Sequence, residues 1–97
     1  GEIALTDLVR LYSTAPADRY RLPKGRLAPG SDADLVLVDP EASWQVEDGD
    51  IISKAGWTPL AGRRFRGGVV STYLRGREIA RDGRCHHSLS GNFVRPR

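Results

Sequence analysis

The chain has 97 residues, of which 39 % are apolar and 28 % are charged, and 11 are glycine. This length suits one small domain and excludes a full-size catalytic barrel, and the composition favours a loop-rich, mostly β protein over a helical bundle or a disordered chain. The net charge of +3 comes from 13 arginines and 2 lysines against 12 acidic residues. Acidic residues fill the middle of the chain, and no RNA-binding aromatic motif or helix-turn-helix pattern accompanies the arginines, so we expect no nucleic-acid partner.

The sequence also bears on cellular location. No apolar run approaches the roughly 20 residues needed to span a bilayer, and the N-terminus lacks the charged and apolar blocks of a signal peptide. Cys85 is the single cysteine, so no internal disulfide can form, which agrees with a reducing compartment. We therefore expect a cytoplasmic protein with no membrane partner.

The N-terminal region predicts a short amphipathic helix over residues 6–14. Thr6 or Asp7 can cap its start, and Pro16 closes its end. A second, shorter turn is predicted over residues 16–20, because proline suits the first helical position and helix breakers follow. The apolar face of the first helix is formed by Leu5, Leu8, Val9 and Tyr12.

The middle of the chain predicts two strands and a turn. Residues 34–39 enclose the apolar run 35–38, which is typical of a strand that is buried on both faces and ended by Pro40. Residues 43–46 predict a brief second strand. The acidic segment 47–54 predicts only a turn or a single helical turn.

The C-terminal half predicts a β-hairpin. Residues 69–74 and 77–81 flank Gly76, which can adopt positive φ. Asp82-Gly83 supplies a further turn signal, and no clear periodicity follows through Arg97. Together with the preceding segments, this predicts a mostly β chain with one or two short N-terminal helices.

A Cys-His-His triplet invites a metal-site hypothesis. Adjacent histidines on a strand point to opposite faces, and a tetrahedral site needs a further, distant ligand. An exposed tail segment is therefore the favoured interpretation of Cys85, His86 and His87.

Other residue types that often carry chemistry also have simpler interpretations. Gly67-Gly68 lacks the Lys-Ser/Thr ending of a phosphate-binding loop and is better explained as a tight entry into the next strand. Trp44 and Trp57 are interpreted as core or domain-interface aromatics. No Gly-x-Ser-x-Gly elbow surrounds the serines that could act as nucleophiles, which are Ser13, Ser53 and Ser71. We therefore expect no catalytic, cofactor-binding or metal-ligating residue in this chain.

The most informative motif is the stretch KGRLAPGSDADLVLVDP at residues 24–40. Its glycines and proline permit sharp turns, and Asp32 or Asp34 can bond neighbouring backbone N–H groups as the strand begins. This stretch resembles the run that returns the chain from the barrel into the small β-sandwich of the amidohydrolase superfamily. Residues 11–17 are similar to the segment after the last barrel helix of that family, with Ala15 in place of a usual asparagine.

Further motifs narrow the resemblance. Three segments are similar to the tail of dihydroorotases and allantoinases, and they are Ser53-Lys54, residues 58–62 and residues 67–77. In that tail a Ser-Lys, a Pro-Phe-x-Gly or Pro-Tyr-x-Gly and a Thr-x-x-x-Gly hairpin recur. Leu60 stands where an aromatic residue is usual. The ending at residues 90–94 resembles the glycine-led tail of some allantoinases and dihydroorotases.

The resemblance implies a domain organisation. Residues 1–23 correspond to the last helix of a (β/α)8 barrel and its connecting turn, and residues 24–97 to the C-terminal part of the amidohydrolase β-sandwich. The implied parent is a dihydroorotase-like, metal-dependent hydrolase of cyclic amides, such as the dihydroorotate of pyrimidine biosynthesis. The expected partners are the parent's N-terminal strands and barrel, and self-association of the isolated chain is expected without them.

The same resemblance implies where the chemistry resides. In the family a zinc centre, usually binuclear with a carbamylated lysine, activates water, and its ligands come from the barrel. None of those ligand motifs occurs in this sequence, so the chain is expected to be structural and inactive alone.

Two alternatives stay open at this point. One is a fragment of an allantoinase or hydantoinase, and the other is a stand-alone, non-catalytic β-rich interaction module. The start Gly1-Glu2-Ile3 and the absence of any methionine favour a piece of a longer protein.

Overall fold

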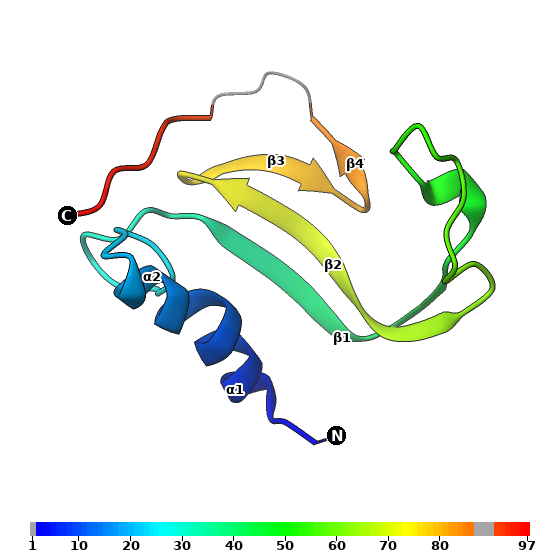
Figure 1. The fold of residues 1–97 in the computed structure, drawn as a ribbon, viewed down its shortest axis with the longest axis horizontal. Coiled ribbons are helices and arrows are strands. Elements are labelled where there is room, and N and C mark those ends of the chain that lie inside the picture. The colour runs from blue at the N-terminus through cyan, green and yellow to red at the C-terminus, as the bar shows by residue number, and fades with distance from the viewer. Residues whose placement is uncertain (1, 87–90) are drawn as a thin grey trace.

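A four-stranded antiparallel sheet forms most of the molecule, and a helical stretch lies beside it (Figure 1). The computed structural model describes residues 2–86 and 91–97. The prediction of a mostly β protein with short N-terminal helices is confirmed. In chain order the elements are α1 (Leu5–Val9), the π-helical turn η1 (Arg10–Thr14), α2 (Ala15–Arg19), β1 (Leu35–Gln45), the 3₁₀ turn η2 (Asp48–Asp50), β2 (Arg64–Leu74), β3 (Arg77–Arg81) and β4 (Arg84–Cys85).

The N-terminal helical segments follow one another without a break, so Pro16 does not end the helix as predicted. The helix begins at Leu5 with Ala4 at the N-cap position and no side-chain cap, so the predicted cap by Thr6 or Asp7 is wrong. In a regular α-helix the proline ring would clash with the carbonyl four residues earlier. The wider π turn η1 precedes the proline, which lies in the first turn of α2, and this widening lets the chain stay helical.

Strand β1 joins two strands that the sequence predicted separately. Its pairing with β2 is interrupted between Asp39 and Ser43, where β1 carries extra residues. Pro40 lies in this bulge, where a residue without an N–H group costs no ladder hydrogen bond. The prediction that Pro40 ends the strand is therefore wrong.

Two tight turns connect the last three strands. Arg75 and Gly76 have φ values of 46° and 79° between β2 and β3, and Asp82 and Gly83 have 50° and 77° between β3 and β4. Positive φ at both central residues matches the twist of a two-residue hairpin. The predicted hairpin and the bounds of β3 are confirmed, whereas the two-residue strand β4 was not predicted.

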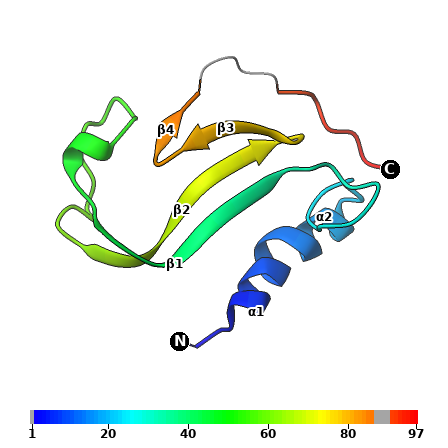
Figure 2. The ribbon, with the colours of Figure 1, turned by 180° about the vertical axis from the view of Figure 1, so that it is seen from behind.

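The helix is joined to the sheet through residues 20–34 rather than by direct packing. Within the described residues, no Cα atom of the helical segments lies within 8 Å of a strand. The Gly76 N–H donates to the Ala33 carbonyl at 2.9 Å, and Thr14 Oγ1 donates to the Gly25 carbonyl at 2.9 Å. Figures 1 and 2 show this loop at one end of both the helix and the sheet. Among the residues that the structure describes, no helix is long and apolar enough to cross a membrane.

The chain buries few of its apolar side chains. Its accessible surface is 8267 Å², whereas a compact protein of 10.7 kDa exposes about 5,500 Å². Its radius of gyration is 15.6 Å, compared with about 12.5 Å for a compact chain of this length. In the described part of the chain, Ala17 and Val46 are the buried apolar residues.

The central apolar run of β1 departs most clearly from its prediction. Val36, Leu37 and Val38 are 54 %, 51 % and 54 % exposed. The expectation of a strand buried on both faces is therefore wrong for this chain by itself. The sheet is a single layer in which both faces of β1 leave apolar side chains accessible.

Candidate functional site

Two of the three residues considered for metal chemistry, Cys85 and His86, lie in the described part of the chain. Cys85 is exposed and free, and His86 Nε2 lies 2.9 Å from Glu78 Oε1. His87 lies outside the described residues. Across residues 2–86 and 91–97, no group of three or more His, Cys, Asp and Glu side chains could hold a metal ion. The described residues therefore do not fit the zinc centre that the resemblance implies for the parent.

The three serines occupy three different environments. Ser13 is half-buried in η1, and Ser53 is exposed. Ser71 is 1 % exposed, and its Oγ has no hydrogen-bond partner among the described residues. It lies between Leu37 of β1 and Arg81 of β3 in the middle of the sheet. No base is placed beside any of these hydroxyls, so the geometry gives no nucleophile in the described part of the chain.

The glycine pair lies inside β2 rather than at its entry as predicted. A Cβ added to Gly68 would lie 3.2 Å from the Ala42 Cβ. Glycine at this position therefore lets the bulge of β1 approach β2 closely. The Trp44 indole, beside this bulge, donates to the Gly67 carbonyl at 2.8 Å and lies 5.5 Å from the Phe65 ring.

A charged cluster, the Lys24 latch (Lys24, Asp32, Asp34 and the Arg75 backbone), ties the loop to the β2–β3 turn. The Lys24 ammonium donates to Asp32 Oδ2 at 2.9 Å and to Asp34 Oδ2, while Asp34 Oδ1 accepts from the Arg75 N–H at 2.9 Å. The hydrogen bond to Asp34, followed by that to Asp32, raises the pKa of Lys24. Burial acts to raise the pKa of Asp34, but the bonds from Lys24 and Arg75 outweigh it and the pKa is lowered. These shifts favour the charged forms of both Lys24 and Asp34, so the latch acts as an ionic structural clamp.

A second cluster, the Glu78 network, lies on β2, β3 and the end of β4. The Glu78 carboxylate accepts from Arg81 Nε and Nη2 at 3.1 and 3.0 Å, from His86 at 2.9 Å and from the Tyr73 hydroxyl at 3.2 Å. The Arg81 bonds, followed by the His86 bond, lower the pKa of Glu78 to about 2. A carboxyl with so low a pKa is ionised near neutral pH, so it has no proton to donate as a general acid and is only a weak general base.

Sequence reasoning missed the Glu78 network for a geometric reason. Residues three apart on a regular strand point to opposite faces. A bulge in β3 at Ile79, opposite the step from Thr72 to Tyr73, breaks that alternation and lets Arg81 reach Glu78. No local signal in the sequence marks this bulge.

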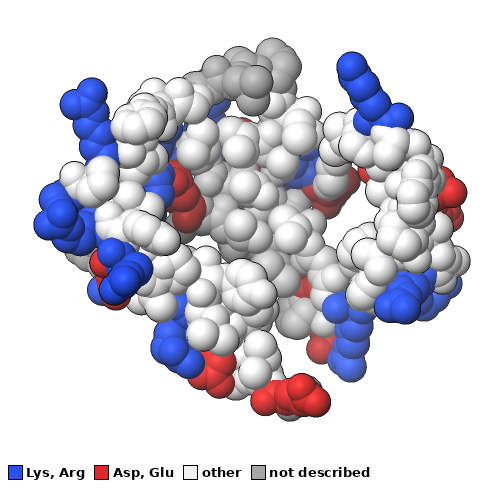
Figure 3. Space-filling model, in the orientation of Figure 1, with Lys and Arg blue, Asp and Glu red and all other residues white. Residues whose placement is uncertain are grey.

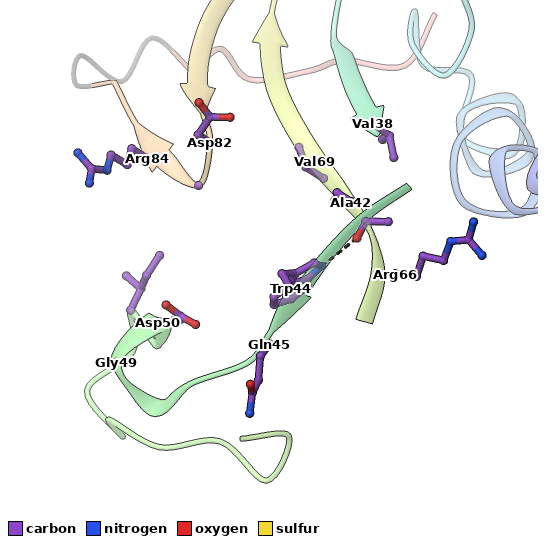
Figure 4. A pocket seen from close by; sticks show the side chains of 14 residues that line it. Val38, Ala42, Trp44, Gln45, Gly49, Asp50, Arg66, Val69, Asp82 and Arg84 are labelled. Atoms are coloured by element: carbon purple, nitrogen blue, oxygen red, sulfur yellow. Dashed lines mark hydrogen bonds between the residues drawn. The ribbon is translucent and has the colours of Figure 1, made fainter. Parts of the chain in front are cut away.

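An open groove of about 1040 Å³ lies between the sheet, the η2 region and the β3–β4 turn. Figure 4 shows Asp50 and Gln45 on one side of it, and Asp82 and Arg84 on the other. Its floor is largely apolar, with Trp44 held in place by the hydrogen bond drawn there. The floor residues come from β1 and β2 and are Val38, Ala42, Trp44 and Val69.

Charged residues surround the apolar surface rather than cover it. In Figure 3, lysine, arginine and acidic side chains gather at the edges of the face in view, and uncharged atoms fill most of its centre. Monomeric proteins seldom expose large apolar patches, and such patches mark surfaces that bind a protein, a membrane or a ligand. The described residues thus form a largely uncharged open face and no catalytic constellation.

Comparison with known proteins identifies the family. The sequence model of the amidohydrolase family matches residues 1–79. The chain belongs to the amidohydrolase family. An allantoinase of Rubrobacter xylanophilus is 41 % identical over 90 residues, which cover 92 % of this chain and 20 % of that protein. A dihydroorotase of Methanothermobacter thermautotrophicus is 37 % identical over 93 residues, covering 95 % of this chain and 21 % of the relative.

A solved structure extends the family likeness to the fold. The L-hydantoinase (dihydropyrimidinase) of Arthrobacter aurescens matches 98 % of this amidohydrolase chain with a TM-score of 0.88 and 31 % sequence identity, over 22 % of its own length. These relatives confirm the predicted resemblance to the cyclic amidohydrolase group. The chain spans about a fifth of the length of the relatives that it matches.

Proposed function

We propose that this chain is the C-terminal, scaffolding part of a dihydroorotase-like hydrolase that acts on carbon–nitrogen bonds of cyclic amides in the cytoplasm. In this proposal residues 1–23 pack as the last barrel helix and residues 24–97 complete a β-sandwich. The zinc centre and its carbamylated lysine belong to the barrel of the parent, and the chain alone is inactive. Its role is to support the barrel, not to touch the substrate.

One observation carries the proposal, which is the large apolar surface that the chain leaves uncovered. The total exposed area of 8267 Å² exceeds that of a compact protein of the same mass by about 2,800 Å². Covering even ~200 Å² of apolar surface on β1 contributes about 5 kcal/mol at 25 cal/mol per Å², an upper estimate. That amount is comparable to the whole stability of a small domain. The apolar helix face and the open edge of β1 supply the surfaces against which a barrel and further strands would pack.

The experiment is reconstitution of the chain with the remainder of its parent. Alone, the chain is expected to show fast amide exchange at residues 35–38, a low melting temperature and no hydrolysis of dihydroorotate, allantoin or hydantoin. Mixed with the remaining segment, it is expected to gain slow exchange at those residues and to restore hydrolysis. The substrate that is turned over identifies the ring that the parent prefers.

A matched pair of variants tests the surface that the proposal names. Val36→Lys places a charge on the exposed face of β1 and is expected to weaken reconstitution at least tenfold. Leu27→Lys makes the same change at an exposed loop position and is expected to leave reconstitution unchanged. A chain that is a stable monomer with slow exchange at residues 35–38, and that gives no response to the remaining segment, would instead support the stand-alone interaction module.

A further inference from the structure

A second cavity, called here the basic cavity, lies at the C-terminal end of α2 and has a volume of about 360 Å³. Its walls come from the end of α2, the loop that follows and the last residue of the C-terminal tail. Figure 3 shows several lysine and arginine side chains along the left edge of the molecule, the side on which Figure 1 places α2 and the C-terminus. One acidic side chain, Asp18, lines the cavity together with four cationic side chains, which are Arg21, Lys24, Arg26 and Arg97.

Internal ion pairs neutralise only part of this positive charge. Arg26 Nη2 donates to Asp18 Oδ1 on the same wall, and the Lys24 ammonium is held by the two aspartates of the Lys24 latch. Neither Arg21 nor Arg97 forms an ion pair with an acidic side chain of the described residues. The basic cavity therefore keeps two guanidinium groups that no described carboxylate side chain balances.

Arg97 is fixed at the cavity by two hydrogen bonds. Its backbone N–H donates to the Arg21 carbonyl at 2.8 Å, and its Nη2 donates to the Gly30 carbonyl at 2.9 Å. A guanidinium carries five N–H donors, so most of them remain after the bond to Gly30. A side chain that its neighbours already hold in place loses less entropy when it binds a ligand.

Arg21 has a backbone conformation that glycine adopts more readily. Its φ is 53° directly after α2, and the Leu22 N–H donates back to the Ala17 carbonyl at 2.8 Å. This pattern ends many helices, and glycine is the usual residue at the left-handed position. A cation is favoured near a helix C-terminus, but Arg19 already supplies one in the last turn. Residues in such sparsely populated conformations cluster at ligand-binding sites.

We infer that the basic cavity binds a small anion that carries a phosphoryl group, with Arg21 and Arg97 donating to its oxygens. Guanidinium groups match the geometry of phosphate, and two of them on one cavity can bond different oxygens of the same tetrahedral group. Ser31 is half-buried in the wall and supplies a hydroxyl. The volume of about 360 Å³ lies at the lower end of the range for small-molecule pockets, so it suits phosphate or a small phosphate ester.

The basic cavity lies outside the surfaces that the proposed function assigns to the remainder of the parent. None of its lining residues belongs to the apolar helix face or to β1. A bound anion joins the C-terminal tail to the end of the helix, because Arg97 and Arg21 belong to these two segments. Binding to the folded state alone stabilises that junction. The inference is therefore independent of the ring that the parent hydrolyses.

The test is calorimetric titration of the complete gene product that carries these residues, with inorganic phosphate and with methyl phosphate. One-to-one binding is expected, and it should weaken as the salt concentration rises. Arg21→Gln and Arg97→Gln are each expected to raise the dissociation constant about tenfold, the loss of one charge-assisted hydrogen bond. Arg19→Gln removes a charge from the same helix end but outside the cavity, and it is expected to leave the constant nearly unchanged. The probe that binds more tightly shows whether the site prefers the free ion or an ester.

Arg21→Gly separates binding from folding. Glycine adopts the left-handed conformation without strain, so this variant is expected to melt at a higher temperature than the wild type when phosphate is absent. The same variant is expected to bind phosphate about tenfold more weakly, because it lacks the guanidinium. An arginine with only a structural role would show no such loss of binding. Far-UV circular dichroism checks that every variant is folded.

Absence of saturable phosphate binding, or binding that Arg21→Gln and Arg97→Gln leave unchanged, would overturn the inference. Tighter binding of a single-stranded oligonucleotide through the same two arginines would also overturn it, because the cavity would then belong to a nucleic-acid surface. Reconstitution of activity is measured separately, so these outcomes leave the proposed function unaffected. Conversely, a chain that does not reconstitute with its remainder would refute the scaffolding role and leave the phosphate site intact.

Discussion

Gly25 packs so tightly against the helix that adding one methyl group should loosen this part of the chain. Gly25 has a φ of +84°, and a Cβ built on it would lie 2.6 Å from both the Ala17 Cβ and the Ser13 carbonyl oxygen. A left-handed conformation costs an L-residue about 1–2 kcal/mol, and an overpacked contact costs about 1–3 kcal/mol. The expected destabilisation by Gly25→Ala is therefore about 2–5 kcal/mol.

Gly30 provides the matched control. Its φ is +88°, but an added Cβ would meet no atom within 4 Å, so Gly30→Ala should cost only the conformational part, about 1–2 kcal/mol. The difference between the two variants isolates the packing of the loop on the helix. It corresponds to about 1–3 kcal/mol, or a 5- to 150-fold difference in an opening equilibrium.

Amide hydrogen exchange of the Leu22 N–H is a suitable assay, because this group donates to the Ala17 carbonyl at 2.8 Å next to the contact. The protection factor of the Leu22 N–H should fall about 5- to 150-fold further in Gly25→Ala than in Gly30→Ala. Equal protection in the two variants would show that the loop is not held against the helix, and the reasoning from the close contact would be refuted.

Three further predictions concern charge, the turn and metal. The pKa of Asp34 is lower in the folded chain than its ordinary value of 3.8, so its contribution to stability is present above pH 4 and lost as the pH falls through the folded value. Asp34→Asn should therefore flatten the dependence of the melting temperature on pH in this acidic range, and an unchanged slope would contradict the prediction. Gly76→Val should lower the free energy of unfolding by about 1 kcal/mol or more relative to Gly91→Val, because φ is +79° at Gly76; urea denaturation measures this, and equal midpoints would remove the argument. Isothermal titration with zinc should show no sub-micromolar stoichiometric site in this chain, and a tight site abolished by replacing both histidines would disprove this.

The parts of the fold that local sequence determines were predictable. The two-residue turn at Gly76, the bounds of β3 and the single helical turn in the segment 47–54 all depend on residues close together in the chain. Local composition and spacing are enough to predict a feature whose interacting residues lie within about ten positions of one another.

The parts that depend on a neighbouring strand or turn were not predictable. Pro40 is tolerated in β1 because the pairing with β2 shifts around it, and Pro16 is tolerated because a π turn precedes it. The apolar run at residues 35–38 predicted burial on both faces, but the structure leaves its middle residues half exposed. The apolar run indicates a strand with packing partners on both faces, and this chain by itself does not supply those partners.

The two edges of the sheet are unequal, and this has a consequence for how the sheet can grow. One edge is the eleven-residue β1, whose pairing with β2 shifts register between Leu37 and Val38 and again at the bulge, and the other ends in the two-residue β4. A strand that adds to β1 gains several backbone hydrogen bonds, whereas addition at β4 gains very few. Growth is thus one-directional: once β1 is occupied, the enlarged sheet offers no equally long edge from this chain, and the assembly terminates instead of extending into a fibre.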